Sequence, residues 1–132
     1  EALIISTKKT EAKYQSIQLG HHWWESLDYA NRQTSLTIDQ SFADTDGTIR
    51  YVISQKDPAI QNWLDTEGFK RGVILMRFDG LDRPLSKSET PTAQLVKFSD
   101  LKNIFSDNNY TKHQRKKEIA SRRKHTQQRY NY

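Results

Sequence analysis

Cysteine is absent from the 132 residues of the chain. Disulfide bonds, thiolate metal ligands and a cysteine nucleophile are therefore excluded, while the cellular compartment stays open. No stretch approaches the roughly 20 apolar residues that a membrane-spanning helix requires, and no signal peptide is visible. Hydrophobic residues make up only 34% of the sequence, yet three Trp, six Tyr and five Phe are enough to build a folded core.

Motifs of common catalytic sites are also missing. There is no G-x-S-x-G elbow, no phosphate-binding P-loop and no H-E-x-x-H zinc motif. His21 and His22 are adjacent and would point to opposite faces of a strand, which makes them a poor pair of metal ligands. We therefore predict no metal site and no cofactor, and we favour a protein that is not an enzyme.

Positive charge is present in excess but unevenly distributed. The chain has 21 Lys or Arg against 16 Asp or Glu, a net charge of +5. Residues 111–132 contain eight Lys or Arg and a single acid, Glu118, so this segment carries +7 and the rest of the chain carries −2. The basicity of the protein therefore belongs to its last segment and not to its body.

This basic segment is predicted to be helical. Thr111 suits the N-cap of a helix that runs to about Arg129. Ile119 and Ala120 are almost its only apolar residues, so we expect the helix to project from the body or to pack through a few side chains such as Ile119 and Tyr130. A solvated helix that pairs with the acidic body or with the remaining chain is the favoured interpretation. The alternative is a helix that contacts phosphate, as in nucleic acid, or an anionic membrane.

Strand patterns recur over the first 98 residues. We expect strands at residues 2–7, 14–19, 34–42, 48–54, 72–78 and 92–98. The turn at residues 44–47 predicts a β-hairpin between the third and fourth strands. The continuous apolar run at 72–78 predicts a central strand covered on both faces. One helical turn is expected over 59–65, and a short helix is expected after Ser99-Asp100.

These elements predict a mainly β fold, an antiparallel, jelly-roll-like β-sandwich with a short helix and a basic C-terminal helix. Residues 1–105 would form the sandwich domain, and residues 106–132 would form a basic helical tail. The chain begins at Glu1, directly before a strand-like run. We therefore expect a C-terminal domain taken from a longer protein.

One stretch resembles a known family. Residues 57–68 read DPAIQNWLDTEG and are followed at 71–77 by RGVILMR. This pattern resembles the "DP…NWLDT.G…GV…R" signature of bacterial proteins that carry the domain of unknown function 1214, and the WWESLDY stretch at 23–29 and the Asp46-Gly47 turn lie upstream as in that family. The resemblance covers about residues 1–105. It implies a β-sandwich in the C-terminal part of a longer protein, and it transfers no catalytic residue.

The candidate ligand-binding residues come from this stretch and from the tryptophans. They are Trp23, Trp24, Asp57, Asn62, Asp65, Arg71 and Arg77. Asp57 is expected to start the turn at Pro58, Asn62 to cap or bridge backbone groups, and Asp65 to cap the next turn or to pair with Arg71 or Arg77. Trp63 is expected in the core, and one tryptophan could line a groove for a sugar or another flat ligand, with Trp23 and Trp24 given equal weight.

The leading hypothesis is a non-catalytic module for ligand binding or assembly within a larger bacterial protein. Its partners would be the remainder of the parent chain and a small polar or sugar-like ligand. A hydrolase or carbohydrate-active enzyme that uses Asp57, Asp65 or His22 near Trp23 is the second hypothesis. Nucleic-acid binding by the basic tail is the third and least favoured.

Overall fold

A computed structural model describes residues 1–131 as seven strands, two α-helices and two short 3-10 turns. The strands are β1 (Ala2–Lys8), β2 (Tyr14–His21), β3 (Ser35–Thr37), β4 (Thr48–Ser54), β5 (Trp63–Asp65), β6 (Gly72–Asp79) and β7 (Thr92–Val96). The helices are α1 (Leu101–Ile104) and α2 (Lys112–Tyr130), and the 3-10 turns span Ile38–Gln40 and Phe98–Asp100. None of the helices in this described part is both long and apolar enough to cross a membrane.

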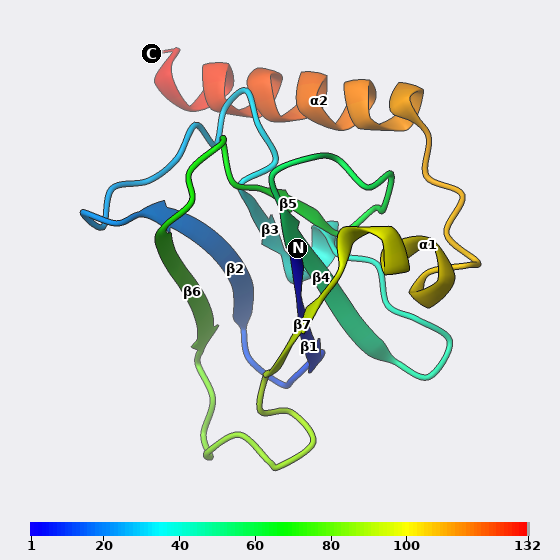
Figure 1. Ribbon diagram of the computed structural model, residues 1–132. Helices are drawn as coiled ribbons and strands as arrows, with labels where there is room; N and C mark the ends of the chain where they lie inside the picture. The colour runs from blue at the N-terminus through cyan, green and yellow to red at the C-terminus, as the bar shows by residue number, and fades with distance from the viewer. Residues whose placement is uncertain (132) are drawn as a thin grey trace.

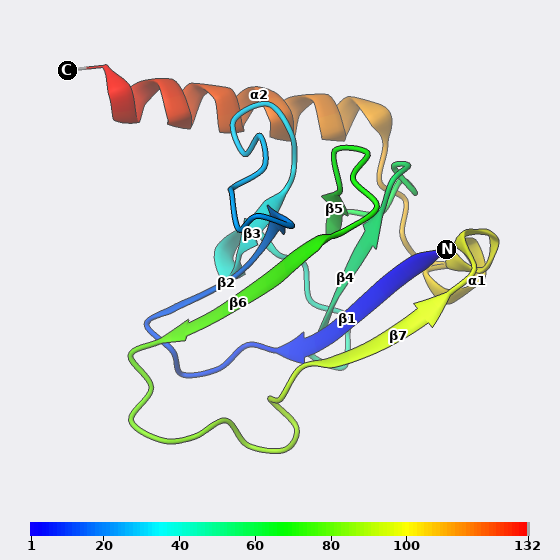
Figure 2. The same cartoon turned by 60° about the vertical axis from the view of Figure 1, so that its left-hand side comes forward.

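The strands form two sheets. One sheet has four strands in the order β5-β4-β1-β7, and the other has three in the order β3-β2-β6. Neighbouring strands are antiparallel, except that β5 runs parallel to β4. Figures 1 and 2 show α2 lying across one end of the two sheets, with α1 beside the end of β7. The prediction of a mainly β, mostly antiparallel fold is therefore confirmed.

The core follows from the period-two pattern of the strands. Inward residues of both sheets, including Ile5, Ile17, Tyr51 and Leu64, form one buried cluster. Alternate residues of the four-stranded sheet point the other way and form a second cluster with Leu101 of α1. Because successive side chains of a strand alternate between faces, β1 and β4 serve both clusters at once.

The expected hairpin at residues 44–47 is wrong, although the turn itself exists. Gly47 donates its N–H to the carbonyl of Asp44 (2.9 Å). The strand before the turn, β3, is short and pairs with β2, whereas β4 after the turn pairs with β1 and β5. The turn therefore connects the two sheets. Local turn chemistry predicted the reversal of the chain but not the partner of each strand.

Two further expectations are corrected. The run at 72–78 forms strand β6, but β6 lies at the edge of the three-stranded sheet and most of its side chains are exposed. The segment 59–65 contains no helical turn, because Trp63–Asp65 pairs as β5 alongside β4. An apolar run identifies a strand more reliably than its place in the sheet, which depends on partners distant in sequence.

Candidate functional site

Helix α2 is attached to the body mainly by arginines. Arg115 is only 8% exposed. Its Nε and Nη2 donate to the carboxylate of Asp57 (2.9 and 3.3 Å), and Nη2 also donates to the carbonyl of Ile60 (2.5 Å). The guanidinium lies 5.1 Å from the ring centroid of Trp63 and 4.5 Å from that of Tyr110, within cation–π range. The buried charge is thus neutralised and hydrogen-bonded, as burial of a charge requires.

Further along α2, Arg122 makes the second attachment. It donates to the backbone carbonyl and the hydroxyl of Ser35, and it lies 3.5 Å from the carbonyl of Tyr29. Burial lowers the pKa of Arg122 from its ordinary value. Arg123 donates to Asn31 (2.9 Å), and the hydroxyl groups of Tyr130 and Tyr29 lie 3.3 Å apart. We call these contacts of Arg115, Arg122, Arg123 and Tyr130 the α2 seam.

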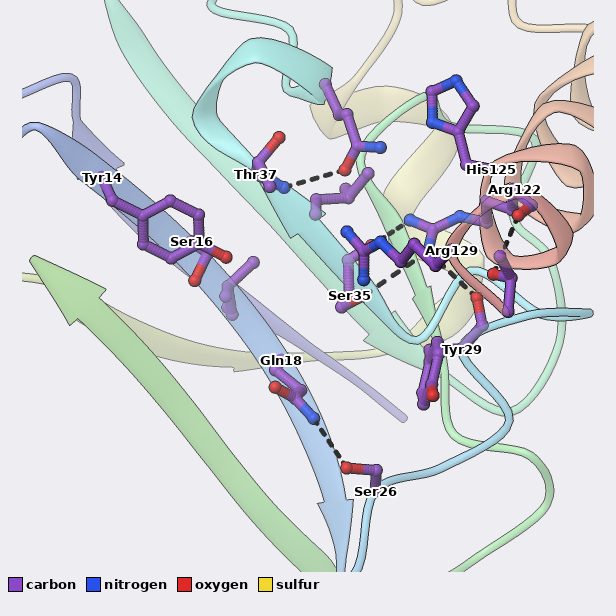
Figure 3. Close-up of a pocket in the computed structure, with 14 residues that line it drawn as sticks. Tyr14, Ser16, Gln18, Ser26, Tyr29, Ser35, Thr37, Arg122, His125 and Arg129 are labelled. Carbon is purple, nitrogen blue, oxygen red and sulfur yellow. Dashed lines mark hydrogen bonds between the residues drawn. The ribbon is translucent and has the colours of Figure 1, made fainter. Parts of the chain in front are cut away.

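Beside the α2 seam, a groove of about 280 Å³ opens between α2 and the outer face of β2 and β3. Figure 3 shows side chains from β2, β3 and α2 around this space. We call it the polar groove. Its lining residues are Tyr14, Ser16, Ile17, Gln18, Ser26, Tyr29, Ser35, Leu36, Thr37, Gln40, Arg122, His125, Thr126 and Arg129.

The periodicity of each element explains why these residues meet. Tyr14, Ser16 and Gln18 alternate along β2 and so share its outer face. On α2, positions 122, 125, 126 and 129 lie three or four residues apart and therefore share one helix face. The groove is the space between these two polar faces.

The chemistry of the polar groove is that of an anion or polyol site. Its lining contains two arginines, one histidine and several hydroxyl and amide groups, but no Asp or Glu. Arg122 is held by Ser35, whereas none of the ion pairs among residues 1–131 includes Arg129. Arginine donors match carboxylate and phosphate oxygens, and the hydroxyl and amide groups match sugar hydroxyls.

The predicted tryptophans lie elsewhere. Trp23 and Trp24 are 73% and 71% exposed in the loop after β2, so neither of them packs in the core. Trp24 has a φ of 65°, which is unusual for a bulky residue. The rings of His21 and His22 lie next to Trp23, with their centroids 3.8 Å apart and their planes tilted by 42°. Within residues 1–131, no group of three His, Cys, Asp or Glu residues is arranged to hold a metal ion.

The polar residues of the family-like stretch have structural contacts. Asp57 accepts the N–H of Ala59 (2.8 Å) and starts the turn as expected, besides pairing with Arg115. Asn62 is buried and bridges three backbone groups, the N–H and the carbonyl of Phe42 and the carbonyl of Arg50.

Asp65 and the two arginines that follow it occupy different surroundings. Asp65 caps the next turn by accepting the N–H of Glu67 (2.8 Å), and its charged partner is Arg32 (2.9 Å). Arg71 lines a cavity of about 170 Å³ near Gly20 and Phe69. Arg77 is exposed on β6, where it pairs in register with Ser16. None of these three residues lines the polar groove.

The residues of the polar groove were not singled out from the sequence. The spacing of Arg122, His125, Thr126 and Arg129 could have indicated part of the groove, because these residues share one face of the predicted helix. The hydroxyl residues of β2 and β3 gave no signal, because alternating polar residues are typical of any strand with one face in solvent. Only the docking of α2 on that face turns them into the lining of a groove.

The chain matches no protein-family model, and no curated protein matches it. It is similar to a solved crystal structure of an uncharacterized protein from Burkholderia cenocepacia, with a TM-score of 0.67 and 28% sequence identity. The match covers 74% of this chain and 26% of that chain. The likeness supports the fold and shows the same architecture within a longer polypeptide, and it brings no activity with it.

Proposed function

We propose that the chain is a non-catalytic ligand-binding unit in the C-terminal part of a larger bacterial protein, with a jelly-roll-like β-sandwich fold related to the domain of unknown function 1214. The two sheets with a shared apolar cluster support the sandwich. The family-like stretch at residues 57–77 supports the relationship. The similar Burkholderia cenocepacia protein, of which the match covers only 26%, supports a longer parent.

The ligand we propose is a small anionic, hydroxyl-rich molecule, such as a carboxylated or phosphorylated monosaccharide, bound in the polar groove. The observation that carries this proposal is a groove with two arginines and no carboxylate in its lining. Its volume of about 280 Å³ is close to the lower limit of roughly 300 Å³ for ligand pockets, which favours a ligand of one sugar ring.

The same lining favours binding over glycoside hydrolysis. Most glycosidases use a pair of Asp or Glu residues that flank the scissile bond. The polar groove offers no such pair, and Asp57 and Asp65 are paired with Arg115 and Arg32. The hydroxyl and amide groups of the groove are suited to hold a sugar rather than to cleave it.

Titration of the 132-residue chain with glucuronate, glucose 6-phosphate and uncharged glucose, followed by NMR chemical shifts, tests the proposal. We expect the two anions to shift groove resonances and to bind more tightly than glucose. Arg129→Ala should weaken anion binding by about tenfold or more, because a hydrogen bond to a charged group contributes roughly 1.5–3 kcal/mol.

Lys124→Ala is the matched control, because it removes the same charge from an exposed residue of α2 that does not line the groove. We expect it to leave the affinity within about twofold, apart from weak general electrostatics. The proposal would be contradicted if both substitutions weakened binding equally, or if none of the three probes shifted the groove resonances.

A further inference from the structure

Strand β6 presents an apolar edge that pairs with no further strand among residues 1–131. It pairs with β2 on one side and forms the end of the three-stranded sheet on the other. Ile74 is 40% exposed and Leu75 is 39% exposed, although they point to opposite faces of the strand. We call the unpaired backbone side of β6, together with these two side chains, the β6 edge.

The hydrogen-bonding groups at the β6 edge can be assigned. Leu19 of β2 donates its N–H to the carbonyl of Thr34 on the β3 side (2.9 Å). Backbone groups of successive strand residues point to alternate sides, so Gln18 directs its groups toward β6, where it pairs with Leu75. Residues 73, 75 and 77 of β6 therefore bond to β2, whereas residues 72, 74, 76 and 78 point their N–H and carbonyl groups away from the sheet.

The β6 edge has few of the features by which proteins prevent unwanted strand pairing. Such edges usually carry proline, lysine, a bulge or a covering segment. Gly72–Asp79 contains no proline and no lysine, and its register with β2 runs without interruption from one end to the other. Arg77 is its one cation. A long, regular and apolar edge of this kind is a template for another strand.

The exposed apolar surface continues from β6 onto the other sheet. The cavity of about 170 Å³ between the sheets is lined by Ile53, Phe69 and Ile74 among others. Ile53 and Phe69 also line a neighbouring cavity of about 600 Å³, together with Leu95 of β7, which is 64% exposed, and with polar residues that include Lys56 and Lys70. The surface therefore spans the free borders of both sheets, which is more than pairing of β6 alone would cover.

We propose that the β6 edge receives an extended strand from another part of the longer polypeptide, whose apolar side chains cover Ile74 and Leu95 and fill the two cavities that these residues line. This inference rests on the proposed place of the chain in a longer protein. The similar protein, of which the match covers only 26%, and the breadth of the exposed surface both favour this occupant. A second copy paired edge to edge through β6 would leave Leu95 uncovered.

Hydrogen exchange distinguishes the bound edge from a free one. In the 132-residue chain, we expect fast exchange at the amides of residues 74, 76 and 78 and protection at those of 73, 75 and 77. In the protein encoded by the complete reading frame, the outward amides should become protected by roughly two orders of magnitude or more, because exchange then requires the added strand to open. The inward amides, protected in both proteins, are the internal control.

A pair of proline substitutions gives a second measurement. Ile74→Pro removes an outward N–H and Leu75→Pro removes an inward one, with a similar loss of side chain. In the 132-residue chain, Leu75→Pro should lower the melting temperature more, because edge strands tolerate proline where the N–H faces solvent. In the longer protein, the two substitutions should lower it by similar amounts.

Each outcome decides the inference. Fast exchange of the outward amides within the longer protein would overturn it while leaving the longer parent in place. Protection that appears in the 132-residue chain as concentration rises, with a doubled mass by light scattering, would assign the β6 edge to a second copy. A complete reading frame no longer than this chain would overturn the proposed parent itself. Ligand binding in the polar groove would be unaffected by any of these results.

Discussion

The α2 seam and the β6 edge reverse the usual distribution of polar and apolar residues. At the α2 seam, a charged side chain is buried, since Arg115 is 8% exposed. At the β6 edge and on β7, apolar side chains are in solvent, since Ile74 is 40% and Leu95 is 64% exposed. Arginine is seldom fully buried unless it is paired, and large contiguous apolar patches are seldom left uncovered.

The difference lies in whether the partners are present. Arg115 has a carboxylate, two backbone carbonyls and two aromatic rings around it, all from this chain. Leu95 and Ile74 have no comparable surroundings among the described residues. The α2 seam is therefore a completed interface, and the β6 edge is one half of an interface. Substitutions at the α2 seam should therefore lower the free energy of unfolding of this chain. Substitutions of exposed apolar residues at the β6 edge should change it little until the partner strand is present.

The largest expected effect on the free energy of unfolding distinguishes a core leucine from an exposed leucine of β7. Leu64→Ala should destabilise the chain by about 3–4 kcal/mol, because Leu64 is fully buried and the truncation leaves a cavity. Leu95→Ala makes the same chemical change at an exposed position and should cost about 0.5 kcal/mol or less. Denaturation by urea measures both free energies of unfolding. Similar losses for the two variants would show that Leu95 is packed in this chain and would remove the contrast.

A smaller but still large effect is expected at the α2 seam. Arg115→Ala should cost about 3 kcal/mol, because it removes the charged partner of Asp57, the hydrogen bonds to the carbonyls of Ile60 and Gln61, and the packing against Trp63 and Tyr110. Lys116→Ala removes the same charge one residue away, where the side chain is exposed, and should change stability by less than about 0.5 kcal/mol. If Arg115→Ala also cost so little, α2 would be attached by its general charge rather than by the seam.

The sequence predicted elements better than their pairing. The alternation in residues 14–19 correctly indicated β2, and Thr111 does cap α2, accepting the N–H of Gln114. The hairpin at residues 44–47 and the central position of 72–78 are wrong, because strand order depends on contacts between distant segments that no local pattern contains. The apolar character of 72–78 did predict a strand, but among residues 1–131 only one side of that strand is paired.

The site was less predictable than the fold. Helical periodicity in the basic segment showed a missing apolar stripe, which indicated a helix with little packing. Arg115 instead packs by combining a long apolar stem, aromatic stacking and fixed hydrogen bonds. The carboxylate that makes this possible, Asp57, lies 58 residues away in sequence. Such pairs become visible only once the fold has placed them together.

The smallest expected effect concerns the loop that joins β6 to β7. There the guanidinium of Arg83 donates to both carboxylate oxygens of Glu89 (2.8 and 2.9 Å), and the N–H of Ser86 donates to one of them (2.8 Å). The hydrogen bonds from Arg83, followed by the one from Ser86, lower the pKa of Glu89 to about 2. Unlike the Arg115–Asp57 pair, the Arg83–Glu89 pair stabilises a surface loop and not an interface between elements.

A pKa lowered in the folded state means that folding favours the ionised carboxylate. The contribution of Glu89 to the order of the loop is therefore complete above its unfolded pKa of about 4.5 and is lost as the pH falls toward about 2. NMR titration of the Glu89 side chain should give a midpoint near 2, and Arg83→Gln should move that midpoint toward 4.5. Lys87→Gln, which removes a charge from the same loop, should leave it nearly unchanged. A midpoint near 4.5 in the unmodified chain would show that the Arg83–Glu89 pair does not form in solution. The loop between β6 and β7 would then lack this restraint, just as the outer edges of β6 and β7 lack a paired strand within residues 1–131.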